Sequence, residues 1–132
     1  MKKIIFSLFT LLLLTGCSDF KPTDEDIVAR VEGVTNYNTF LKFLENIEQR
    51  KEDKIRIVHY TTEGDPILST LSFSGKVITY TYDSTRDQYG PGEILTTKCK
   101  SIKSEKAGEK TTYSLTECEE DDLSGEILIV SN

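Results

Sequence analysis

The chain has 132 residues and a formal net charge of −6, from 16 basic and 22 acidic residues. That length suits one modest domain. The acidic balance excludes a general nucleic-acid-binding protein, which needs a basic stripe. The three cysteines are an odd number, so at least one of them lies outside any intramolecular disulfide.

The N-terminus carries the features of an export signal. Lys2 and Lys3 provide a positive start, and residues 4–14 form an apolar stretch interrupted only by Ser7 and Thr10. This stretch is too short to be a stable membrane span. It therefore predicts a signal peptide rather than a permanent transmembrane helix.

The residues that follow resemble the bacterial lipobox. Leu14, Thr15 and Gly16 precede Cys17, and small residues at these positions admit a peptidase to the bond before the cysteine. The thiol of Cys17 can then accept a diacylglyceryl group. We expect a lipoprotein; the alternative is an uncleaved signal anchor with a buried or free cysteine.

This signal predicts three parts: a signal peptide at 1–16, a lipidated cysteine with a short tether at 17–26, and a single α+β domain at 27–132. Cleavage removes two lysines and takes the formal charge from −6 to −8. Two or more acyl chains, such as diacylglycerol with an added palmitate, give stable anchoring. We therefore expect the domain at the extracytoplasmic face of the cell membrane, attached through Cys17.

The first elements of the domain show two different periods. Alternation predicts a strand from Ile27 that ends at Gly33. A helix follows, with Asn38 as N-cap and with Arg50 and Lys51 at its negative C-terminal end. Its apolar stripe has the spacing of one helix face and consists of Phe40, Phe43, Leu44 and Ile47.

Three strands with period two come next, at 54–62, 67–74 and 76–83. A two-residue turn at Ser74 and Gly75 predicts pairing of Leu71 with Ile78, of Ser69 with Tyr80 and of Ile67 with Tyr82. A four-residue loop from Glu63 to Pro66 predicts pairing of Val58 with Leu71 and of Tyr60 with Ser69. One sheet face would then carry Val58, Tyr60, Leu71 and Ile78 toward the helix.

A long polar loop precedes a third predicted hairpin. A loop at 107–110 aligns a thiol pair, an apolar pair and two ion pairs in one register. The aligned residues are Cys99 with Cys118, Ile102 with Leu115, Lys100 with Glu117, and Lys98 with Glu119.

Facing cysteines in an exported domain predict a structural disulfide between Cys99 and Cys118. A redox or metal pair is the alternative, but the chain has no C-x-x-C motif and only one histidine. We expect no cofactor and no metal site. Whether the acidic segment 117–122 binds calcium stays open, since it lacks the spacing of an EF-hand.

Catalytic signals are weak. His59 is the sole histidine and lies within an apolar strand, and no G-x-S-x-G elbow is present. We expect His59 to be a packed or surface residue. The enzyme question stays uncertain, with a non-enzymatic protein favoured.

Four segments carry a resemblance to a known family. They are Val31 to Gly33, Ile55 to Ile67 with its "EGDP" core, Thr79 to Asp83, and Thr96 to Lys100. In these segments the chain resembles small Bacillus-type lipoproteins carrying domain of unknown function 4362. The resemblance implies a Gram-positive envelope lipoprotein, and it brings no activity and no functional residues.

The function that we expect is a binding or accessory module that contacts another envelope protein or a small ligand. The alternatives are a small envelope hydrolase and an immunity or inhibitor lipoprotein. Tyr60, Glu63 and Asp65 form the candidate partner surface. The competing interpretation is that residues 63–66 only form a turn. The sequence does not determine the oligomeric state.

Overall fold

The computed structural model describes residues 19–132. Within that part of the chain, no helix is long and apolar enough to cross a membrane. The elements in chain order are β1 (Ile27–Arg30), β2 (Gly33–Thr35), α1 (Tyr37–Glu48), β3 (Asp53–Tyr60), β4 (Pro66–Phe73), β5 (Ile78–Asp83), β6 (Ile94–Ala107), β7 (Lys110–Cys118), the short 3-10 helix η1 (Asp121–Leu123) and β8 (Gly125–Ser131).

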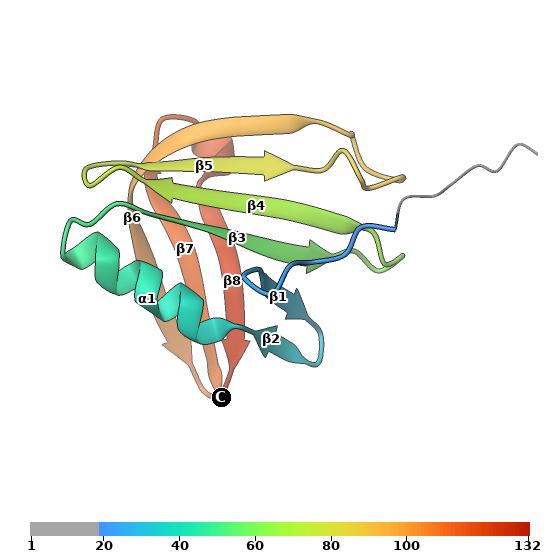
Figure 1. The fold of residues 1–132 in the computed structure, drawn as a ribbon, viewed down its shortest axis with the longest axis horizontal. Helices are drawn as coiled ribbons and strands as arrows, with labels where there is room; N and C mark the ends of the chain where they lie inside the picture. Colours follow the sequence, from blue (N-terminus) through green and yellow to red (C-terminus); the bar gives the residue numbers. More distant parts are fainter. Residues whose placement is uncertain (1–18) are drawn as a thin grey trace, which may run out of the picture.

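All strands belong to one sheet in the order β2-β1-β3-β4-β5-β6-β7-β8. Neighbouring strands are antiparallel except β1 and β3, which are parallel and are connected through α1. β6 first runs alongside β5 and then bends, so that its second half, β7 and β8 run steeply across the direction of β3, β4 and β5, and the sheet curls around α1 (Figure 1). The predicted α+β class, one helix on a largely antiparallel sheet, is confirmed.

The core lies between α1 and the sheet. Phe40 and Phe43 are fully buried, and Leu44 and Ile47 pack against the same cluster. The ring of Phe40 meets the ring of Tyr113 on β7 edge-on, with 4.8 Å between the centroids. The predicted apolar stripe of the helix is therefore correct.

The predicted ends of this helix are wrong. Asn36, not Asn38, is the N-cap residue, and it has left-handed backbone geometry with φ 58°. Its side-chain amide donates to the backbone oxygens of Asp24 and Asp26 instead of capping the helix. α1 ends at Glu48, so Arg50 and Lys51 lie beyond its last turn.

The first predicted strand is in fact a small hairpin. β1 ends at Arg30, the chain turns at Val31 and Glu32, and β2 begins at Gly33. The alternation of apolar residues continues through this turn, which is why the sequence pattern did not reveal it. β8 was not predicted either, although Ile127 and Leu128 place it in the core.

Two predicted strand registers are wrong, with different consequences. In β4–β5, Leu71 pairs with Tyr80 instead of Ile78, because the turn spans residues 74–77. This shift of two residues leaves every side chain on its predicted face. In β3–β4, Leu71 pairs with Ile55, an odd shift that puts Ile55 and Ile57 on the helix side in place of Val58 and Tyr60.

The predicted register of the third hairpin is correct. Cys99 pairs with Cys118 and Ile102 with Leu115, and the two cysteines form a disulfide. The amine of Lys100 lies 3.5 Å from the carboxylate of Glu117. The second ion pair, Lys98 with Glu119, is not among the ion pairs of residues 19–132. The backbone N–H of Glu119 instead donates to the Lys98 oxygen at 2.9 Å.

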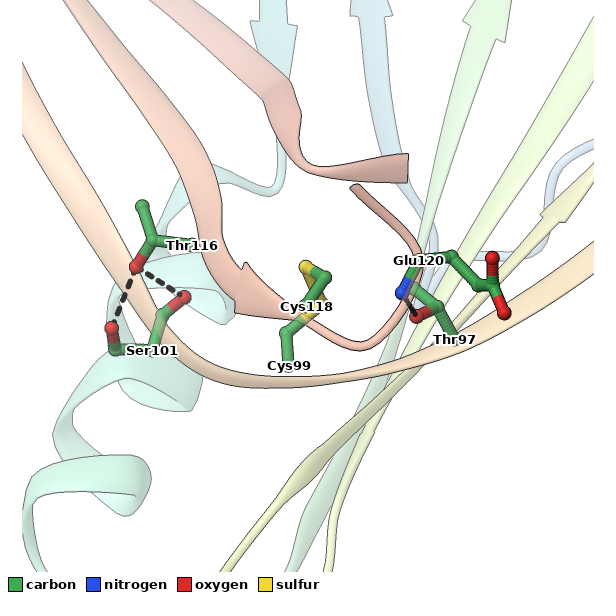
Figure 2. The surroundings of a disulfide bond; sticks show 6 residues. All are labelled: Thr97, Cys99, Ser101, Thr116, Cys118 and Glu120. Atoms are coloured by element: carbon green, nitrogen blue, oxygen red, sulfur yellow. Dashed lines mark hydrogen bonds between the residues drawn. A yellow bond between two sulfur atoms is a disulfide. The ribbon is translucent and has the colours of Figure 1, made fainter. Parts of the chain in front are cut away.

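The disulfide lies at the point along β6 where the neighbouring strand changes from β5 to β7. β6 pairs with β5 over residues 94–99 and with β7 over residues 99–107, so Cys99 has a neighbour on both sides. Figure 2 shows the bond between two side-chain contacts, Ser101 with Thr116 and the Glu120 N–H with Thr97 Oγ1. The bond therefore links β7 to β6 at the bend of the sheet.

Candidate functional site

The candidate partner residues lie where β1, β3 and β5 all end. Three connections meet there: the turn at 31–32, the loop 61–65 and the loop 84–93, which together we term the loop end. The two longer loops lie side by side at the right of Figure 1, with the first described residues of the tether between them. The loop end is thus also the place where the chain enters the domain.

Loop 61–65 is built on its own backbone hydrogen bonds. The N–H of Thr61 donates to the oxygen of Asp65, and the N–H of Gly64 donates to the oxygen of Thr61, both at 2.9 Å. Gly64 has φ 90°, a conformation that glycine adopts without strain. The structure brings Tyr60, Glu63 and Asp65 together in and beside this loop, as the sequence suggests.

Two of these three side chains already have partners within the domain. The guanidinium of Arg30 lies over the ring of Tyr60, 4.1 Å from its centroid. The carboxylate of Asp65 accepts a hydrogen bond from the N–H of Gln88 at 2.9 Å, which joins loop 61–65 to loop 84–93. Glu63 is exposed. Of the three, Glu63 is the side chain best placed to meet a partner.

Loop 84–93 is closed by a buried serine. Ser84 is fully buried, and its N–H donates to the oxygen of Glu93 at 2.9 Å. The N–H of Glu93 donates in turn to Ser84 Oγ at 3.1 Å. Beside it, burial acts to raise the pKa of Asp83, but hydrogen bonds from Thr85 and the charge of Arg86 outweigh burial and lower it. The loop end is therefore a surface whose two longer loops are held in place by hydrogen bonds within the domain.

The tether contacts this part of the domain through Phe20. The guanidinium of Arg56 lies 5.7 Å from the centroid of the Phe20 ring, and the guanidinium of Arg86 lies 5.3 Å from it. Both distances are within the range of cation–π attraction. Phe20 is only three residues from Cys17. No sequence pattern pointed to this contact.

A buried ion pair holds the next part of the tether. Arg56 donates to both carboxylate oxygens of Asp26, at 2.8 and 2.7 Å, and Asp26 is 4% exposed. Burial acts to raise the pKa of Asp26, but the hydrogen bonds from Arg56 and Thr23 outweigh it and lower the pKa. The hydrogen bonds to Asp26 and its negative charge raise the pKa of Arg56. Both groups are charged across the physiological range.

This ion pair forms part of an open depression of about 610 Å³. Its lining residues supply hydroxyls and charges of both signs: Thr23, Asp24, Glu25, Asp26, Thr39, Lys54, Ile55, Arg56 and Thr70. Asp26 and Arg56 are hydrogen-bonded to each other, and Lys54 is exposed. The hydroxyls and charges of this lining suit a small polar group.

His59 is the next-to-last residue of β3 and is partly buried. Burial lowers its pKa, although the backbone of Ile127 and the charge of Glu126 act in the opposite direction. Its imidazole is therefore neutral near pH 7. Among residues 19–132 the structure contains no hydrogen bond from His59 to a serine or a carboxylate side chain, and no group of three side chains there could hold a metal ion.

Comparison with known protein families gives two matches. The model described as a domain of unknown function (DUF4362) matches residues 24–114. The chain belongs to the DUF4362 family. A prokaryotic membrane lipoprotein lipid attachment site matches residues 1–18, which include Cys17. No curated protein and no solved structure matches the chain.

The DUF4362 match spans β1 to β6 and the first part of β7, so it includes Asp26, Arg56 and the whole loop end. It ends before Cys118 and β8. The family description assigns no activity, so membership of this family does not identify the function of the chain. The predicted family is confirmed, and the match at residues 1–18 supports the predicted lipoprotein attachment site.

Proposed function

We propose that this DUF4362 protein is a lipoprotein of the extracytoplasmic face, cleaved before Cys17 and anchored through diacylglycerol on that cysteine. The matched lipid attachment site is the observation that carries the proposal. The Cys99–Cys118 disulfide supports it, since such bonds persist outside the cytoplasm. The domain division 1–16, 17–26 and 27–132 belongs to the same proposal, as does the Gram-positive envelope that the family resemblance implies.

The anchored domain acts as a binding or accessory module. Its partner surface is the part of the loop end formed by Tyr60, Glu63 and Asp65. What supports this assignment is that the loops are braced by Asp65 and Ser84 while Glu63 is left exposed. A pre-organised loop with a free carboxylate loses little conformational entropy on binding, and such a carboxylate suits a basic group on an envelope protein or small ligand.

The anchor is tested by fractionation and mass measurement of the protein made in its native host. Wild-type protein should sediment with membranes and carry an acyl mass at Cys17. The Cys17→Ala variant should stay unlipidated and be secreted or accumulate as precursor. An unchanged membrane fraction and unchanged processing in that variant would refute the anchor.

The partner surface is tested by cross-linking on intact cells. Glu63→Lys should abolish capture of a partner that wild type captures in near-stoichiometric amount. Glu105→Lys is the matched control, since Glu105 is also exposed but lies on β6, outside the loop end. Equal capture by both variants would remove Glu63 from the surface. Failure to capture any partner reproducibly with wild type would argue against the accessory function.

A further inference from the structure

Given the proposed anchor at Cys17, we infer that the loop end of the domain lies against the lipid headgroups, with Val31, Tyr89 and Ile94 in contact with them. The first argument is chain length. Phe20 is the third residue after Cys17, and three residue steps at full extension span about 11 Å. Whatever Phe20 contacts must therefore stay near the membrane surface.

The second argument is where Phe20 is held. Its ring lies close to the guanidinium groups of Arg56 on β3 and of Arg86 in loop 84–93. The following residues are held as well, since the N–H of Thr23 donates to the Asp26 carboxylate and Asp26 is bound by Arg56. The anchor is thus joined to the domain by a short segment that is held at the loop end. The contact of Phe20 with Arg56 and Arg86 therefore determines which side of the domain faces the bilayer.

The third argument is the distribution of exposed apolar side chains. In residues 19–132 the large apolar side chains with the highest exposure are Val31, Leu41, Tyr89, Ile94 and Ile129, and three of these belong to the loop end or border it. Val31 is fully exposed at the turn after β1, Tyr89 is 76% exposed in loop 84–93, and Ile94 is 59% exposed at the start of β6. Tyrosine favours the headgroup layer, where its ring and hydroxyl are both accommodated.

Contacts between the loops keep these three side chains at one end. Arg30, next to Val31, lies over Tyr60, from which loop 61–65 begins. Asp65 then accepts a hydrogen bond from Gln88, next to Tyr89. The loop end itself is mainly acidic, since it contains Glu32, Glu63, Asp65, Asp87 and Glu93 but only Arg86 as a basic residue. The anchor and the apolar side chains therefore place the loop end at the membrane, without a need for electrostatic attraction.

The orientation constrains the partner. A protein that contacts Glu63 must reach it beside the headgroup layer, and an integral membrane protein is the class that can do so. The tip of the β6–β7 hairpin, at residues 108–109, lies at the bottom of Figure 1, away from the loop end at its right, and would stay clear of the headgroups.

The chain contains no tryptophan, so one introduced tryptophan reports its own surroundings. The test uses the full-length lipidated protein in vesicles of phosphatidylglycerol and phosphatidylethanolamine with nitroxide-labelled headgroups. Tyr89→Trp should lose emission to the nitroxide and shift to shorter wavelength. Glu109→Trp, at the hairpin tip, should keep its emission. Tyr89→Trp combined with Phe20→Ala should be quenched less, because the orientation loosens.

The possible failures can be told apart. A chain that mass measurement finds unlipidated at Cys17 would overturn the proposed anchor and this inference with it. A lipidated, vesicle-bound protein with equal emission loss for Tyr89→Trp and Glu109→Trp would overturn the orientation alone. Quenching that is unchanged by Phe20→Ala would overturn the role of Phe20 as the contact that sets the orientation.

Discussion

Arg56 on β3 binds Asp26 with two hydrogen bonds across 30 residues of sequence. Asp26 directly precedes β1, so the pair attaches the entry of the chain to an interior strand of the sheet. A charged group that is 4% exposed depends on such a partner, because burying an unpaired carboxylate is costly. The pair is therefore the main polar contact between the tether and the domain.

Replacing Arg56 with alanine leaves the Asp26 carboxylate buried without its partner. We expect Arg56→Ala to lower the free energy of unfolding by about 2 kcal/mol, below the cost for a fully buried pair because the arginine side chain is 33% exposed. Urea denaturation measures this change. Lys42→Ala is the control, since its ion pair with Glu45 is largely exposed and should contribute less than about 0.5 kcal/mol. Equal losses in both variants would contradict the importance of the buried pair.

The same carboxylate predicts how acid affects stability. The pKa of Asp26 is lower in the folded state than in the unfolded state. Its contribution is therefore present above the unfolded pKa of about 3.9 and is lost as the pH falls through the folded pKa. The stability difference between wild type and Asp26→Asn should be largest near pH 7 and shrink on acidification below about pH 4. Urea midpoints measured across this range check it, and a difference independent of pH would refute it.

Local patterns in the sequence predicted part of the fold well. The stripe containing Phe40 and Phe43 has one helical period, and in the β6–β7 hairpin the cysteine pair and Lys100 with Glu117 select one register. The β3–β4 register was harder, because it depends on the length of loop 61–65. Thr61 and Asp65 close that loop by hydrogen bonds between residues that also suit a shorter turn.

The candidate site was only partly predictable. The "EGDP" motif is a local signal, and a turn does form there, although it spans residues 61–65 and Pro66 already belongs to β4. The contacts of Phe20 and Asp26 join residues that are about 30 or more positions apart, and a single aromatic or acidic residue carries no local trace of such a partner. These contacts follow from the way β1 docks beside β3, which the sequence pattern did not reveal.

The disulfide predicts a large stability loss on its removal. Cys99 and Cys118 close a loop with a sequence separation of 19, which should stabilise the fold by about 3 kcal/mol on the chain-entropy model. The Cys99→Ala and Cys118→Ala double variant should lose about that much free energy of unfolding. Reduced wild-type protein should change in the same direction. Two titratable thiols at these positions in denatured, non-reduced protein would contradict the bond.

Tyr37 on α1 predicts an effect at alkaline pH. Its hydroxyl is hydrogen-bonded to that of Tyr113 on β7, and burial together with this contact raises the pKa of Tyr37 to about 12. A raised pKa in the folded state means that the unfolded state loses its proton first, so stability falls as the pH rises from about 10 toward 12. Tyr37→Phe should be less stable than wild type at pH 7 by about 1 kcal/mol, the contribution of one hydrogen bond. Its further loss of stability above pH 10 should be smaller than that of wild type, since it lacks the group that titrates.

Urea midpoints at pH 7 and above pH 10 measure both effects, with Tyr89→Phe as the exposed control that should follow wild type. Parallel losses in wild type and Tyr37→Phe at high pH would show that deprotonation of other groups drives alkaline unfolding.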